Sequence, residues 1–104
     1  MHYVILAEHA GEVCPTSNAK TKALMLEIGP QIPKLAEQNQ VKILAGPFIS
    51  REHVAVVIVE ADQAENLDNF LMESRLPHWN RVRVLPSLPI EKAMQEVGAS
   101  PSLF

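Results

Sequence analysis

Short apolar runs separated by polar turns divide the chain into strands and helices. Residues 54–59 are apolar at every position, so we expect their strand to lie in the centre of a sheet with both faces covered. Gly46-Pro47 indicates a bend in an edge strand, because proline has no N–H to give to a neighbouring strand. Four strands are predicted in all, over residues 3–7, 41–49, 53–60 and 81–85.

Helical spacing follows the first strand. An apolar stripe predicts one amphipathic helix that bends near Gly29-Pro30, with Ser17 or Asn18 as its N-cap. The residues of this stripe are Leu24, Ile28, Ile32 and Leu35.

A second helix is predicted after the third strand. Asp62 with Glu65 three residues later matches a capping box. The inner face of this helix is expected to carry Ala64, Leu67, Phe70, Leu71 and Ser74. A short helix over 90–97 follows the fourth strand, and Met25, Met72 and Met94 are interpreted as core residues.

The predicted order of elements is β-α-β-β-α-β. In 104 residues this order is typical of an α+β, ferredoxin-like domain, here over residues 1–97, with 98–104 as a C-terminal tail. Such a domain has a four-stranded antiparallel sheet in the order 4-1-3-2. Two helices cover one face of that sheet, and the other face is apolar. We therefore expect a second copy of the chain to cover it, helped by Leu103 and Phe104 of the tail.

The chain resembles the dimeric α/β-barrel superfamily over about residues 2–97. The resemblance rests on the strand at 3–7, the hairpin around Arg51, and the segment 70–74 that leads into His78-Trp79-Asn80. Members pair their sheets face to face, and they include isomerases, monooxygenases, haem-degrading enzymes and binding proteins. Some small members bind nickel or other transition metals. The resemblance implies a homodimer and leaves the function open.

Charge and composition exclude some classes of partner. The chain has 9 basic and 12 acidic residues, a net charge of −3, so no basic surface is expected for nucleic acid. No apolar run is long enough to span a bilayer, so we expect no membrane partner. The chain starts without a signal-peptide pattern, and its single cysteine cannot form an internal disulfide, so we expect a cytoplasmic protein.

The reactive side chains gather at one end of the predicted sheet. His9 ends the first strand, His53 starts the third, His78 precedes the fourth, and Cys14 lies in the loop that leaves the first strand. Imidazole and thiolate are preferred ligands of copper, nickel and zinc. We therefore predict a homodimeric protein that binds a transition metal through Cys14, His53, His9 and His78, ranked in that order. A helix N-terminus after Cys14 would favour the thiolate.

Other interpretations of these residues stay open. Polar side chains collect at strand ends in any case, His78 would also suit a helix cap, and Cys14 would also suit a small apolar packing site. Cys14 also fits a nucleophile or peroxide-sensing thiol with His9 or His53 as its base. Cys14-Pro15 is a dipeptide found where cysteine ligates haem, which we rank below a transition metal. The alternative function is a cofactor-free or haem-using enzyme, of isomerase or monooxygenase type, acting on a small molecule in the barrel cavity.

Five further residues are expected to support such a site. Glu8 and Glu52 flank two of the histidines and could orient their rings. Trp79 either walls a pocket at the same end of the sheet or closes the core. Arg81 and Arg83 share one face of the fourth strand, where they would bind a small carboxylate in an inter-subunit cavity or be ordinary edge-strand charges.

Overall fold

Alternating burial along the first strand sets the two faces of the sheet. The structure is a computed structural model that describes residues 1–102. Its first strand, β1 (His2–Glu8), buries Tyr3, Ile5 and Ala7 on one side and leaves Val4 and Leu6 partly exposed on the other. This alternation follows from the two-residue repeat of a strand. The buried side faces the helices and holds the core.

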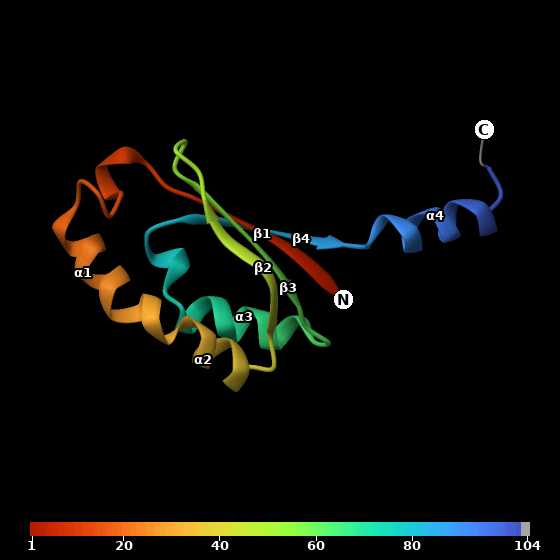
Figure 1. The fold of residues 1–104 in the computed structure, drawn as a ribbon, viewed down its shortest axis with the longest axis horizontal. Helices are drawn as coiled ribbons and strands as arrows, with labels where there is room; N and C mark the ends of the chain where they lie inside the picture. Colours follow the sequence, from red (N-terminus) through yellow and green to blue (C-terminus); the bar gives the residue numbers. More distant parts are fainter. Residues whose placement is uncertain (103–104) are drawn as a thin grey trace.

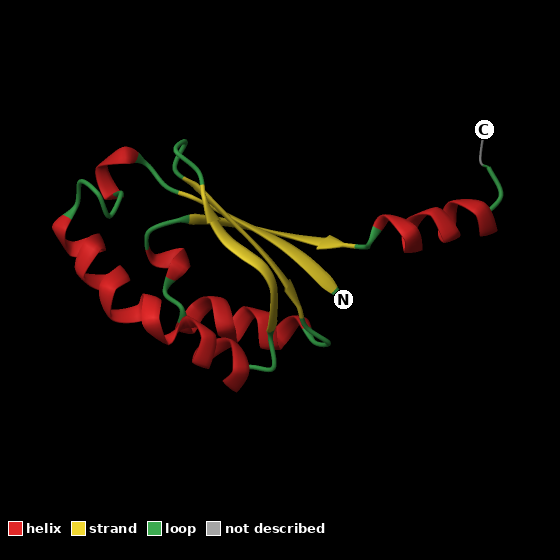
Figure 2. Ribbon diagram, viewed as in Figure 1, coloured by secondary structure: helices red, strands yellow, loops and turns green. Residues whose placement is uncertain are grey.

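The sheet has the strand order β2-β3-β1-β4, which is the expected order 4-1-3-2 from the opposite edge (Figure 2). β1 pairs antiparallel with both of its neighbours, and β3 lies in the interior of the sheet as predicted. The α+β fold with a four-stranded antiparallel sheet is therefore confirmed. The other strands are β2 (Lys42–Ile49), β3 (Val54–Glu60) and β4 (Arg81–Ser87).

The predicted bent helix is two α-helices joined by a single 3-10 turn. α1 (Ala19–Ile28) runs into the turn Gly29–Gln31, and α2 (Ile32–Gln38) continues from it. Pro30 lies at the start of that turn, where its missing N–H leaves no hydrogen bond broken. The apolar stripe nevertheless keeps its phase, since residues on both sides of the turn are buried or packed against the core. Ile28 is buried, and Ile32 and Leu35 pack against the core.

The third helix, α3 (Ala64–Glu73), buries Leu67, Phe70 and Leu71 as predicted. The predicted capping box at Asp62 is wrong, because the N-cap is Gln63 and its side chain makes no capping hydrogen bond. Ala64 is exposed, since it lies in the first turn beyond the core. After α3 the backbone of Arg75 takes a positive φ of 60° and leads into a 3-10 turn at Leu76–His78.

The last helix, α4 (Ile90–Ala99), extends away from the sheet and continues two residues beyond the predicted end at residue 97 (Figure 1). The prediction that three methionines fill the core is wrong. Met25, Met72 and Met94 are 42%, 53% and 58% exposed. The predicted role of Leu103 and Phe104 falls outside the described residues.

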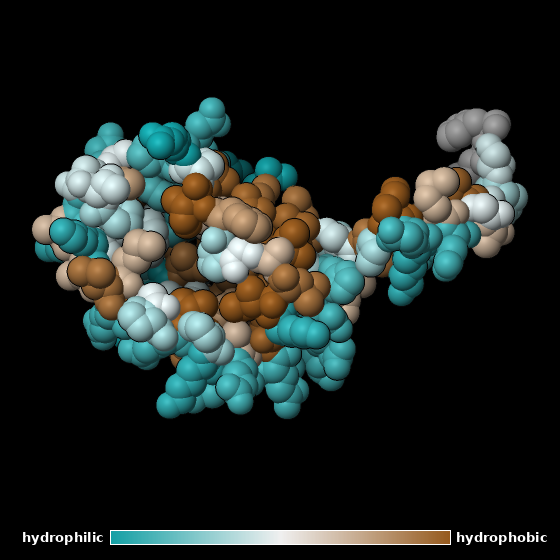
Figure 3. Space-filling model, in the orientation of Figure 1, coloured by the Kyte–Doolittle hydropathy of each residue, from teal (hydrophilic) through white to brown (hydrophobic). Residues whose placement is uncertain are grey.

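One face of the sheet has no helix against it, and we call it the open face. The register places its residues in cross-strand rows, with Val4 between Ile58 and Leu85, and Leu6 between Val56 and Arg83. Hydrophobic side chains reach the surface over the strands in Figure 3. The described chain thus leaves an apolar sheet face uncovered, which soluble monomers seldom do.

Candidate metal centre

The antiparallel register of β1 and β3 brings two histidines together. Glu8 lies opposite Val54, so the next residues outward, His9 and His53, are direct neighbours. The backbone N–H of His9 donates to the carbonyl of His53 at 3.1 Å. Their rings lie edge to face with centroids 5.1 Å apart. This confirms the expectation that the two histidines are cross-strand neighbours.

The loop after β1 folds back over this end of the sheet and carries Cys14 with it. Backbone N–H groups of Ser17 and Asn18 both donate to the carbonyl of Cys14, at 2.9 and 2.8 Å. The side-chain amide of Asn18 donates to the carbonyl of Glu12, and its Oδ1 accepts from the N–H of Thr21. Asn18 is therefore the N-cap of α1, as predicted, and it also fixes the loop to the helix.

His9, Cys14 and His53 form a group that could hold a metal ion. One ligand atom from each residue lies within 4.8 Å of the others. Cys14 is buried, with 7% of its surface exposed, and the two histidines are half-buried. His78 is exposed in its 3-10 turn and does not belong to this group. His2 lies at the other end of the sheet, 3.5 Å from the carboxylate of Glu60.

A hydrogen bond from His9 to Asn80 determines which nitrogen of His9 is free to bind. The amide nitrogen of Asn80 donates to the carbonyl of Leu76 at 3.1 Å, so its Oδ1 is the atom that faces His9 Nδ1 at 3.0 Å. In the neutral imidazole, Nδ1 then carries the proton and Nε2 keeps the lone pair. Nε2 is buried and has no hydrogen-bond partner within residues 1–102. Such a buried and unpartnered nitrogen is available to coordinate a metal ion.

Sequence reasoning missed Asn80 as part of the site. The pairing of β1 with β4 could have indicated it. Arg81 pairs with Glu8, so Asn80, which precedes Arg81, approaches His9, which follows Glu8. The expected partners of the histidine rings, Glu8 and Glu52, are both exposed. Within residues 1–102, Asn80 orients the ring of His9 instead. It can do so because it is buried beside the ring, whereas both carboxylates point to solvent.

Contacts with Thr16 favour the thiolate form of Cys14. The hydroxyl of Thr16 lies 3.0 Å from the sulfur, and this hydroxyl together with the Thr16 backbone N–H lowers the pKa of Cys14. Burial opposes the shift, and His53 adds a smaller lowering. The predicted effect of a helix dipole on Cys14 is wrong, because α1 begins at Ala19 and not directly after Cys14.

Trp79 lies against the same group of residues. Its ring is 5.0 Å from that of His9 and inclined by 50°. The indole ring of Trp79 therefore lies against the imidazole of His9. Arg81 and Arg83 are exposed on the open face of β4.

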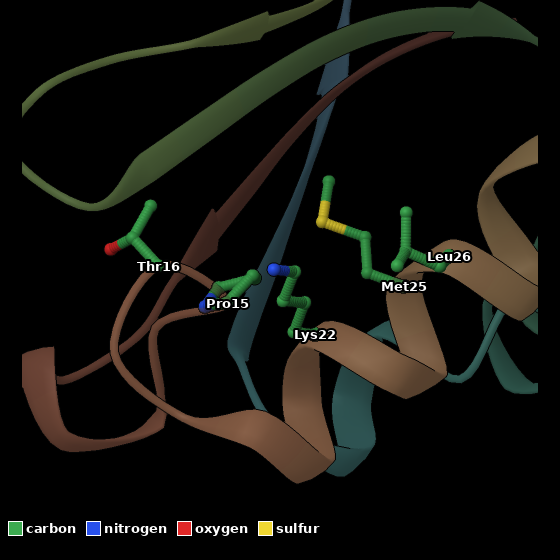
Figure 4. Close-up of a pocket in the computed structure, with 5 residues that line it drawn as sticks. All are labelled: Pro15, Thr16, Lys22, Met25 and Leu26. Carbon is green, nitrogen blue, oxygen red and sulfur yellow. The ribbon is translucent and has the colours of Figure 1, made fainter.

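A surface hollow of about 430 Å³ lies beside the loop (Figure 4). It lies between the loop and the first turns of α1. Thr16 therefore borders both this hollow and the thiol of Cys14. The residues that line it are Pro15, Thr16, Lys22, Met25 and Leu26.

No protein-family profile matches the chain, and a comparison with curated proteins finds no similar sequence. Over residues 1–102, the helices are too short or too polar to cross a membrane. The function must therefore be inferred from the geometry of the site.

Replacing Thr16 by valine should raise the pKa of Cys14, because the hydroxyl that favours the thiolate is lost. The pKa is measured from the ultraviolet absorbance of the thiolate during a pH titration of the metal-free protein. Thr16→Ser keeps the hydroxyl and should leave the pKa close to that of the unaltered protein. An equal pKa in the valine and serine variants would contradict the role of the hydroxyl.

Proposed function

We propose that the protein binds a transition metal ion through His9, Cys14 and His53. The observation that carries the proposal is the convergence of three donors from β1, its following loop and the start of β3 within 4.8 Å. One thiolate and two imidazoles suit copper, zinc or nickel, and they do not suit magnesium or calcium. The unpartnered, buried Nε2 of His9 supports the same conclusion.

Three protein donors leave a coordination position for a further ligand. Sites with three protein ligands and one exchangeable position are typical of metals that bind or transform a small molecule, whereas structural zinc sites are closed by four. His78 is the fourth ligand that the sequence offers. It is exposed in the turn before Trp79 and would have to turn inward, so we rank it last.

Replacing Cys14 by serine should reduce metal affinity far more than replacing His2 by alanine. Serine keeps the size of the side chain and removes the soft donor, whereas His2 lies at the opposite end of the sheet. His9→Ala and His53→Ala should weaken binding as Cys14→Ser does. Isothermal titration with zinc or copper gives affinity and stoichiometry for each variant.

The same titration in acid should show affinity falling steeply below neutral pH, because both thiol and imidazole must lose a proton to bind. Equal stoichiometry and affinity in the Cys14→Ser and His2→Ala proteins would end the proposal and leave Cys14 as a packing residue.

Asn80 should contribute to affinity although it is not a ligand. Removing an outer hydrogen-bond partner of a metal-bound histidine typically costs 10–100-fold in affinity, and we expect a loss of about that size for Asn80→Leu. Asn80→Asp keeps an acceptor for Nδ1–H and should restore most of the affinity. Circular dichroism verifies that both variants fold. Full affinity in the leucine variant would show that Asn80 does not orient His9.

We also propose that the protein is a homodimer in which a second copy covers the open face. The support is the apolar row of Val4, Ile58 and Leu85, for which the described chain supplies no cover. Arg81 and Arg83 would then border the interface. A dimeric mass by light scattering at micromolar concentration is the expected result, and a monomeric mass would contradict it.

A further inference from the structure

The helix α4 stands apart from the rest of the molecule (Figure 1). The radius of gyration is 16.1 Å and the extents are 54 × 30 × 19 Å. A compact chain of this length has a radius of gyration of about 13 Å. The excess comes from the arm that α4 forms beyond the end of β4.

The sequence of α4 is amphipathic, with one apolar side that is typical of a helix packed against another surface. Ile90, Ala93, Met94 and Val97 follow helical spacing and form one apolar stripe. Ile90, Met94 and Val97 are 66%, 58% and 69% exposed. A ten-residue helix is marginal in water unless its apolar side is covered. The described chain therefore shows α4 without the surface that would stabilise it.

α4 does not lie over the sheet of its own chain. β4 ends at Ser87 and α4 begins at Ile90, so only Leu88 and Pro89 join them. α4 continues outward from the end of β4 instead of turning back (Figure 2). This places the apolar stripe where another molecule can reach it.

The open face complements α4 in polarity and in charge. Its apolar rows are bordered on β4 by Arg81 and Arg83, which are exposed and take part in no ion pair within residues 1–102. The helical wheel places Glu91 and Glu96 on opposite flanks of the α4 stripe, and they are likewise exposed and unpaired there. An apolar stripe with an acidic residue on each flank can thus cover the apolar face and turn one of these residues toward the arginines on β4.

We propose that α4 packs through its apolar stripe on the open face of a second copy of the chain, with an acidic flank of the helix, Glu91 or Glu96, facing the partner's Arg81 and the partner's Arg83. Two-fold symmetry makes the exchange reciprocal, so each copy gives one helix and receives one. The docking site lies on the open face, and none of the three proposed metal ligands belongs to it. Arg81, which pairs with Glu8, is its part nearest to His9. α4 itself leaves the sheet at the other end, where Ser87 lies beside His2.

Sedimentation equilibrium on the full chain tests the apolar part of this interface. The double variant Met94→Glu/Val97→Glu places charge in the stripe and should raise the dimer dissociation constant by about tenfold or more. The matched control Gln95→Glu/Ala99→Glu adds the same charge to the opposite side of α4 and should change it by less than about threefold. Equal dissociation constants for the two double variants would overturn the proposal, as would a monomeric unaltered protein.

Charge reversal tests the polar part. Arg81→Glu/Arg83→Glu and Glu91→Arg/Glu96→Arg should each weaken the dimer, because like charges then face each other across the interface. The protein with all four substitutions should recover most of the lost affinity. If the losses of dimer affinity in the two double variants simply add in the fourfold variant, the proposed pairing of glutamates with arginines is wrong. Zinc titration of every variant should give unchanged stoichiometry, which separates loss of the dimer from loss of the fold or of the metal centre.

Discussion

The antiparallel pairing of β1 with both of its neighbours is the constraint on which the site depends. Pairing with β3 sets His9 opposite His53, and pairing with β4 brings Asn80 up to the ring of His9. A shift of either register by one residue would turn the corresponding side chains to the other face. The buried alternation of Tyr3, Ile5 and Ala7 fixes that register, so the core of the domain also determines the geometry of the site.

The loop after β1 supplies the third donor of the candidate site. The ends of two strands provide the imidazoles, and the loop from Gly11 to Asn18 folds back to place the sulfur of Cys14 beside them. Thr16 lowers the pKa of that sulfur, and Asn80 leaves the lone pair of His9 Nε2 buried and unpartnered. A buried acceptor without a partner costs about 1–3 kcal/mol. A bound metal would remove this cost, so the arrangement is consistent with a centre prepared for an ion.

Hydrophobic periodicity was sufficient to predict much of the fold. It predicted the strand order and the central place of β3, and with the order it predicted the meeting of His9 and His53. It did not predict Asn80 or Thr16, because their contacts depend on side-chain positions in a 3-10 turn and a loop that no repeat pattern encodes. It also predicted α4 as a helix without indicating that it leaves the body, since periodicity identifies an apolar side but not the surface that covers it.

The central claim is that one thiolate and two imidazoles bind the same ion. X-ray absorption spectroscopy of the zinc-loaded protein tests this most directly, because sulfur and nitrogen scatter differently and lie at different distances. The account predicts one sulfur at about 2.3 Å and at least two imidazole nitrogens at about 2.0–2.1 Å from zinc. A first shell of nitrogen and oxygen alone, with no sulfur, would contradict it.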